Sequence, residues 1–163
     1  MVRRKTLTKR MVKNLESEIA ILQKLTSPHV VSLIDLQKTT NNYYIFLEFC
    51  NGGDLNNLVE LRKRIDERSA RILTAQIVHG LYDLFKSRAI HRDIKLANIL
   101  LHFPQQNGKK QLTEAFLEKV DLSTTPVEVR IADLGFAKTL EEEDMTKTQC
   151  GTPLNMAPEI MNG

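Results

Sequence analysis

The residues best suited to chemistry stand in one stretch of the sequence, His91 to Leu100, which reads HRDIKLANIL. Asp93 and Asn98 are spaced so that a tight loop can aim both side chains at one point, and Lys95 projects the same way as Asp93 in an extended or turn backbone. An acid, an amide oxygen and an ammonium that converge suit a metal-bound phosphate, because the cation cancels charge while the oxygens hold Mg²⁺. The alternative is a charged, solvated turn before a strand.

The same stretch resembles the catalytic loop of protein kinases, whose signature is H-R-D-L-x-x-x-N. Ile94 replaces the leucine of that signature, and Lys95 is the residue that serine/threonine kinases carry there. The strings DLG at 133–135 and APE at 157–159 follow in the order expected of this family. Within the family, the strings EIAILQKL, LEFCNGGDL and CGTPLNMAPEIM are most similar to the autophagy-initiating serine/threonine kinases.

The resemblance implies the roles of several residues in phosphoryl transfer, a reaction in which the protein mainly positions groups and stabilises charge. Asp93 would orient the substrate hydroxyl and accept its proton, and Lys95 would steady the γ-phosphoryl group of ATP. Asn98 and Asp133 would hold Mg²⁺. Glu18 would pair with the lysine that anchors ATP in this family.

A nucleotide pocket is implied as well. Leu47 would lie behind the adenine, Glu48 to Cys50 would form the hinge whose backbone groups read the adenine edge, and Asp54 would approach the ribose. Leu100 would form the floor of the pocket. Four residues would stack as a spine between two lobes, a role compatible with plain core packing: His91, Leu134, Leu22 and Leu33.

The segment from Asp133 to Glu159 would be the activation segment of the family. Thr148 is the expected phosphorylation site and Thr146 a second candidate. A phosphate on either threonine would pair with Arg92 and order the loop. Thr152 is expected to contact the catalytic loop, and the alternative for Thr146 and Thr148 is that they are ordinary polar loop residues.

Two family features are not found among these 163 residues, namely the G-x-G-x-x-G loop and the V-A-I-K strand. Lys5 is the only substitute for the lysine of that strand, and it lies several residues too close to Glu18. We therefore expect an incomplete kinase domain that shows no measurable activity alone. The competing hypothesis is a pseudokinase-like scaffold that acts by binding proteins.

Hydrophobic spacing predicts the elements that position these residues. Apolar residues at helical intervals predict a helix over Lys9 to Lys24, ended by the proline that follows. The β-rich runs 30–34 and 43–49, joined by the polar turn 39–42, predict a hairpin. Asp54 is a plausible N-cap of a short helix.

The second half of the chain is predicted to hold a longer helix opening at Asp66 and Glu67, with strands at 99–101 and 127–132. The fold class is α+β, a truncated two-lobe kinase fold that lacks its first strands. Residues 1–50 would be the remnant of the small lobe and 51–163 the start of the large lobe. Without the later helices of that lobe, the helix from Asp66 would leave apolar surface exposed.

Residues 102–125 form an insert that is atypical of the family and rich in glutamine, lysine and glutamate. Its middle, Gln111 to Val120, is expected to form a helical turn or two. No chemistry is predicted for it, and a surface elaboration is the expectation.

Composition bounds the class of protein without naming a partner. The chain is 42% hydrophobic and 26% charged, with a net charge of +3, as in ordinary globular proteins. The basic cluster near the start has no interleaved aromatic residues, which favours a solvated face over a nucleic-acid site. Two distant cysteines and no long apolar run predict a cytoplasmic chain without a transmembrane segment. The expected partners are ATP, protein substrates and regulatory proteins, and the expected cofactors are ATP and Mg²⁺.

Overall fold

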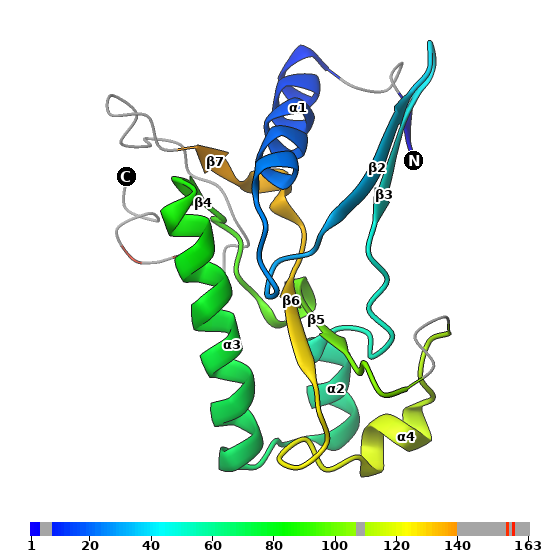
Figure 1. Ribbon diagram of the computed structural model, residues 1–163, viewed down its shortest axis with the longest axis vertical. Helices are drawn as coiled ribbons and strands as arrows, with labels where there is room; N and C mark the ends of the chain where they lie inside the picture. Colours follow the sequence, from blue (N-terminus) through cyan, green and yellow to red (C-terminus); the bar gives the residue numbers. More distant parts are fainter. Residues whose placement is uncertain (4–7, 107–109, 140–155, 157, 159–163) are drawn as a thin grey trace.

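A computed structural model of the protein describes residues 1–3, 8–106, 110–139, 156 and 158 (Figure 1). The helices in chain order are α1 (Lys9–Lys24), α2 (Leu55–Arg62), α3 (Glu67–Lys86) and α4 (Glu114–Lys119). The strands are β1 (Val2–Arg3), β2 (Leu33–Lys38), β3 (Asn42–Leu47), β4 (Ala89–Ile90), β5 (Ile99–His102), β6 (Glu128–Ile131) and β7 (Lys138–Thr139). Short 3₁₀ turns cover Leu96–Asn98 and Leu134–Phe136.

The upper part of the molecule in Figure 1 consists of α1 and an antiparallel sheet of order β1-β3-β2. Helix α1 has the predicted bounds and begins where the side chain of Thr8 accepts a hydrogen bond from the amide of Met11, at 3.3 Å. It packs against the turn Leu134–Phe136, which follows Asp133. The helix that carries Glu18 therefore lies against the segment that carries Asp133.

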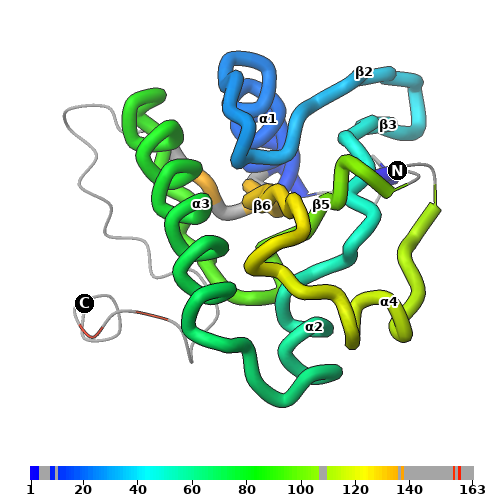
Figure 2. Tube along the Cα trace, turned by 60° about the horizontal axis from the view of Figure 1, so that its bottom comes forward, coloured from blue at the N-terminus to red at the C-terminus, as the bar shows by residue number. Residues whose placement is uncertain are grey.

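The lower part is organised around the antiparallel pair β5–β6, in which Ile99 lies opposite Ile131. The inward side chains of this ladder, Leu101, Val129 and Ile131, are fully buried. Helix α3 packs against β6, and Figure 2 shows the pair lying between α3 on one side and the segment of α4 on the other. Gly80 permits this close packing, since a Cβ at that position would lie 2.8 Å from Cδ1 of Ile131 on β6 and 2.7 Å from the carbonyl oxygen of His29.

The predicted hairpin forms, but its first strand was placed wrongly. Strand β2 begins at Leu33, and Val30 and Val31 lie outside it. Val30 instead forms a parallel bridge with Ile131, and the amide of Val31 donates to the carbonyl of Ile131 at 2.9 Å. The reason is burial: Val30 and Val31 are both buried in the core, which an exposed hairpin strand with alternating faces could not provide.

The insert contains the predicted helical segment, which is α4. It is more than a surface elaboration, because Leu117 and Leu122 are buried and Phe116 meets Phe103 edge-on, with ring centroids 5.5 Å apart. Arg62, at the end of α2, donates from Nε to the carbonyl of Leu117 at 2.8 Å and also binds the carbonyl of Val120. These contacts fix the C-terminal end of α4 against α2.

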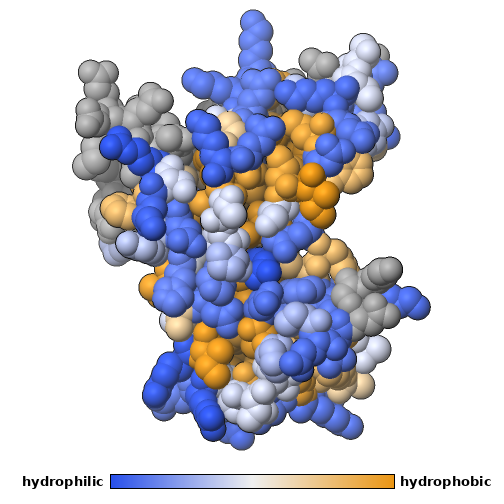
Figure 3. Space-filling model, in the orientation of Figure 1, coloured by the Kyte–Doolittle hydropathy of each residue, from blue (hydrophilic) through white to orange (hydrophobic). Residues whose placement is uncertain are grey.

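Helix α3 carries exposed apolar residues, as expected, on the face opposite to its buried residues. Leu73 and Leu84 point into the core, whereas Val78, Tyr82 and Phe85 are exposed. Figure 3 shows a second apolar area between α1 and β2. Below this area, the outline of the molecule narrows at the level of the chain that leaves β3. Among the described helices, none has the length and apolarity needed to cross a membrane.

Candidate functional site

The predicted convergence of an acid, a cation and an amide is present in the loop between β4 and β5. Asp93 is only 3% exposed, and its Oδ2 lies 2.8 Å from Nζ of Lys95. The amide nitrogen of Asn98 donates to the backbone carbonyl of Asp93 at 2.9 Å and to its Oδ2 at 3.3 Å. The loop therefore holds one carboxylate in a fixed orientation through two neighbouring side chains.

His91 joins this loop to the end of β6. Its Nε2 lies 2.9 Å from the carbonyl oxygen of Ala132, and its Nδ1 lies 3.3 Å from the amide of Asp93. An amide can only donate and a carbonyl can only accept, so these partners select a neutral ring with its hydrogen on Nε2. Burial lowers the pKa of His91, in agreement with a neutral imidazole. His91 therefore holds Asp93 in a fixed position relative to Ala132, the residue before Asp133.

Asp133 follows directly from that anchored backbone. The amide of Ala132 donates to the backbone carbonyl of Asn98 at 2.8 Å, which places Asp133 next to the catalytic loop. Its own backbone is left-handed, with φ of 61°, and its exposed carboxylate accepts from the amide of Gly135 at 3.3 Å. Arg92 is also left-handed, with φ of 68°. Such conformations concentrate at functional sites, where the surrounding structure enforces them.

The donor atoms at this point suit a hard cation. The side-chain nitrogen of Asn98 is directed at Asp93, so its side-chain oxygen Oδ1 is the atom left for a ligand, and the carboxylate of Asp133 is exposed. Mg²⁺ prefers such oxygens and often takes only one or two protein ligands beside substrate phosphates. In the described part of the chain, no three histidine, cysteine or acidic residues form a metal cluster. A cation here would therefore need further ligands from a bound phosphate or water.

Glu18 reaches the same region from α1. Its Oε2 lies 3.8 Å from the position that a Cβ on Gly135 would occupy. Burial, and then the negative charge of Asp133, raise the pKa of Glu18 above its usual value of 4.5. No cation of the described residues forms an ion pair with it. Lys5, the substitute considered from the sequence, lies outside the described residues.

The raised pKa of Glu18 predicts a pH-dependent gain of stability for Glu18→Gln. A carboxyl whose pKa is raised by folding costs stability once the pH exceeds its unfolded value, so the amide variant should melt higher than the parent at pH 7.5. The difference should vanish as the pH falls to about 4.5, the ordinary value. Thermal melts from pH 4.5 to 8 test this, with the exposed Glu16→Gln on the same helix as control. A lower melting temperature at pH 7.5 would show that Glu18 has a cationic partner.

The predicted hinge, Glu48 to Cys50, follows β3, and the chain then continues through residues 51–54 to the start of α2. Leu47 is exposed at the end of β3, whereas Cys50 is buried. The segment then pairs with β5: the amide of Gly52 donates to the carbonyl of Leu101 at 2.8 Å, and Asp54 bridges to Leu100. The residues predicted to contact the ribose and to form the adenine floor, Asp54 and Leu100, therefore lie side by side.

Two predicted pocket residues have side chains with other partners. The carboxylate of Asp54 caps α2, accepting from the amide of Asn57 at 2.9 Å and from its side chain at 2.7 Å. Contact with a ribose would compete with these bonds. The side chain of Glu48 turns to Arg130 and its amide donates to the carbonyl of Ser32, which leaves the backbone carbonyl of Glu48 for a base edge.

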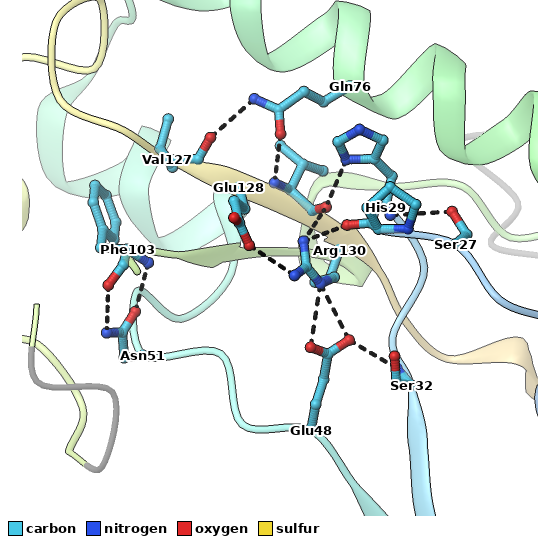
Figure 4. Close-up of polar contacts among 12 residues, drawn as sticks. Ser27, His29, Ser32, Glu48, Asn51, Gln76, Phe103, Val127, Glu128 and Arg130 are labelled. Carbon is cyan, nitrogen blue, oxygen red and sulfur yellow. Dashed lines mark hydrogen bonds and ion pairs between the residues drawn. The ribbon is translucent and has the colours of Figure 1, made fainter. Parts of the chain in front are cut away.

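Asn51 and Arg130 are the structural residues that the sequence reasoning missed. Asn51 is fully buried, and Figure 4 shows its side chain pairing with the backbone of Phe103. The amide of Phe103 donates to Oδ1 of Asn51 at 2.8 Å, and Nδ2 donates back to the carbonyl of Phe103 at 3.1 Å. The insert joins this point, because the amide of Leu112 donates to the carbonyl of Asn51 at 2.8 Å. An Asn-Gly-Gly run that reads as a flexible break is therefore firmly anchored.

Cys50 is expected to resist alkylation. Burial, followed by the charge of Glu48, raises the pKa of its thiol from 9.0 to about 11. Two pKa units reduce the reactive thiolate about 100-fold near pH 8. In a Cys150→Ser background, iodoacetamide should modify Cys50 about 100-fold more slowly than a small thiol of pKa 9, with the rate rising tenfold per pH unit. Modification at the rate of that reference thiol would contradict the burial of Cys50.

The predicted regulatory threonines, Thr146, Thr148 and Thr152, lie outside the described residues. Arg92, their predicted partner, is half-buried in the catalytic loop, one residue before Asp93.

Comparison with known proteins assigns the family. The model of the protein kinase domain matches residues 1–163. The chain is 34% identical to the serine/threonine-protein kinase ATG1 of Candida glabrata, over 99% of this chain and 20% of that protein. It is 34% identical to ATG1c of Arabidopsis thaliana and 35% identical to human ULK1, over 95% and 90% of this chain and 19% and 13% of those proteins. The chain thus spans about a fifth or less of the length of these relatives. It belongs to the protein kinase family and is similar across nearly its whole length to serine/threonine kinases of the ATG1 and ULK1 type.

Proposed function

We propose that the protein transfers the γ-phosphoryl group of ATP to serine or threonine hydroxyls of protein substrates, with Mg²⁺ as the metal ion. The observation that carries this proposal is the buried carboxylate of Asp93, which contacts Lys95 and Asn98. Two hydrogen bonds connect it to Asp133: His91 donates to the carbonyl of Ala132, and the amide of Ala132 donates to the backbone carbonyl of Asn98. A fixed base, a cation and two oxygen ligands are the parts this reaction needs.

Asp93 would accept the proton of the substrate hydroxyl as the new bond to phosphorus forms. Its orientation is set before substrate binds, because Asn98 holds both its backbone carbonyl and its carboxylate. Lys95 would stabilise negative charge on the transferring group, and its distance of 2.8 Å from Asp93 keeps it at the reacting point. Mg²⁺, held by Asn98 and Asp133, would supply charge neutralisation on the ATP phosphates.

The proposal also covers how the nucleotide binds, how the activity is regulated, and where and with which partners the protein acts. The backbone of Glu48 to Cys50 would read the adenine, with Leu47 behind the base and Leu100 beneath it. Phosphorylation of Thr148 or Thr146 would order the activation segment through Arg92, and Thr152 would contact the catalytic loop. We place the protein in the cytoplasm, with protein substrates and regulatory proteins as partners, in autophagy initiation or related signalling.

A non-catalytic scaffold is the second candidate function. The observation that favours it is Glu18, whose carboxyl has no cationic partner among the described residues and lies near the like charge of Asp133. In an assembled kinase site this carboxylate pairs with the lysine that anchors ATP. A scaffold would keep the fold of the hinge and catalytic loop without needing that pair.

The test measures transfer of radiolabelled phosphate from ATP to a generic basic protein, followed by phosphoamino-acid analysis. Both the 163-residue chain and any longer product of the same reading frame are assayed, with Mg²⁺ or with a chelator. We expect phosphoserine or phosphothreonine from the longer product in the presence of Mg²⁺ only, and no measurable transfer from the 163 residues alone. No transfer by either product would favour the scaffold.

A further inference from the structure

We propose that Arg130 and Glu48 form a latch that ties the hinge to the strand leading to Asp133, so that hinge position and metal-site position are coupled. Arg130 lies on β6, three residues before Asp133, and Glu48 follows the last residue of β3. The two are 82 positions apart in the chain. The consequence for nucleotide rests on the proposed function, whereas the latch itself is a property of the fold.

In this contact one donor of Arg130 is shared between both carboxylate oxygens of Glu48, and both side chains are largely shielded from water. Nε of Arg130 lies 3.1 Å from Oε1 and 3.2 Å from Oε2 of Glu48. Only 12% of the Arg130 side chain and 24% of the Glu48 side chain are exposed. Figure 4 shows the guanidinium of Arg130 at the centre of this group, facing the carboxylate of Glu48. Partial burial weakens solvent screening, so this pair should contribute more than an exposed ion pair.

A third segment, the linker between α1 and β2, is held at the same point. Nη1 of Arg130 donates to the carbonyl of Pro28, and the amide of Ser32 donates to Oε1 of Glu48 at 2.8 Å. The amide of Glu48 in turn donates to the carbonyl of Ser32 at 3.0 Å. This linker begins where α1, the helix of Glu18, ends. Arg130 therefore contacts or adjoins the segments that present the hinge, Glu18 and Asp133.

This arrangement has a mechanical consequence. If the hinge rotated away from β6, the carboxylate of Glu48 would lose its contact with the guanidinium of Arg130, which other groups hold in place. One of those groups is Glu128, on the same strand as Arg130, whose Oε2 lies 2.7 Å from Nη2. Arg130 would remain paired with Glu128 after release, which lowers the cost of opening and makes the latch reversible. Opening and closing of this kind often set the rate at which nucleotide leaves an enzyme site.

Glu128 also supplies a matched control. Glu48→Gln removes the charge that ties Arg130 to the hinge, whereas Glu128→Gln removes a charge that ties Arg130 only to its own strand. Both changes are isosteric and both take one carboxylate from the same guanidinium. Arg130→Met and the double variant Glu48→Gln/Arg130→Met complete a cycle.

The experiment measures dissociation of a fluorescent ADP analogue across a range of Mg²⁺ concentrations, using the full protein. We expect Glu48→Gln and Arg130→Met each to accelerate dissociation by about threefold or more, and the double variant to be no faster than either. Arg130→Met should also raise the Mg²⁺ concentration at which half of the ADP analogue remains bound. A general loss of stability would not change this concentration. Glu128→Gln should behave as the parent protein.

The outcomes distinguish a failure of the latch from a failure of the proposed function. Parent-like dissociation in Glu48→Gln and Arg130→Met, or equal acceleration in Glu128→Gln, would overturn the latch. If the parent protein binds no nucleotide, the proposed function fails, and hydrogen exchange at the amide of Glu48 decides the latch by itself. Faster exchange in Glu48→Gln and Arg130→Met but not in Glu128→Gln would support it, and equal exchange in all four proteins would overturn it.

Discussion

Replacing Asp93 with asparagine is expected to lower the rate of phosphoryl transfer about 10²- to 10⁴-fold, the usual contribution of a positioned general base. The amide has the same shape as the carboxylate, so it can keep the contact with Asn98 while losing the ability to accept a proton. It also loses the ion pair with Lys95. The rate is measured by phosphate transfer with the catalytically active product, at saturating ATP.

The exposed Asp35→Asn on β2 is the matched control for this change. Among the residues that the structure describes, its carboxylate accepts from its own strand, from the amide of Leu36 at 2.7 Å and the side chain of Gln37 at 3.1 Å. It should leave the rate unchanged. Retention of more than a tenth of the parent rate by Asp93→Asn would remove Asp93 from the role of base, and a large loss in Asp35→Asn would show that the assay reports folding.

The second large effect is expected on stability, from Phe103→Ala. This ring is completely buried and meets Phe116 edge-on, so its removal leaves a cavity between β5 and the insert. Loss of a buried phenylalanine typically costs about 3–5 kcal/mol, a large share of the stability of a domain of this size. The free energy of unfolding is measured by urea denaturation at neutral pH.

Phe85→Ala supplies the comparison, because that ring is 67% exposed on α3. Its free energy of unfolding should change by no more than about 0.5 kcal/mol, as for other surface substitutions. A cost below about 1 kcal/mol for Phe103→Ala would mean that the insert collapses into the vacated space. That outcome would contradict the view that the insert is fixed by Arg62 and Asn51.

The catalytic loop was predictable because its residues are close in the chain. Asp93, Lys95 and Asn98 lie within six positions, and a single turn of backbone brings them together. Helix α1 was equally accessible, since its apolar stripe and its end before Pro28 are local signals. Local sequence signals therefore fixed both the convergence on Asp93 and the element that carries Glu18.

Long-range partners were beyond this reasoning. Nothing near Glu48 indicates that its carboxylate meets an arginine 82 residues later, and nothing near Asn51 indicates pairing with Phe103. Val30 and Val31 were assigned to the hairpin because β-branched runs predict strands, but their burial against Ile131 outweighed that local preference. Which partners these side chains contact depends on the tertiary fold, and the neighbouring sequence alone does not determine it.

The position of the insert explains how the chain accommodates it. The two strands that flank it are paired to their ends, with His102 opposite Glu128, so the extra residues begin and finish at neighbouring points. The entropy of closing such a loop grows only with the logarithm of its length, and doubling the length adds about 0.6 kcal/mol. Lengthening at this place therefore costs little free energy, while the hydrogen bond from Leu112 to Asn51 joins the added segment to the residue that follows the predicted hinge. Variation in the length of the insert would in this way reach the segment that follows the predicted hinge, without any change in strands β5 and β6.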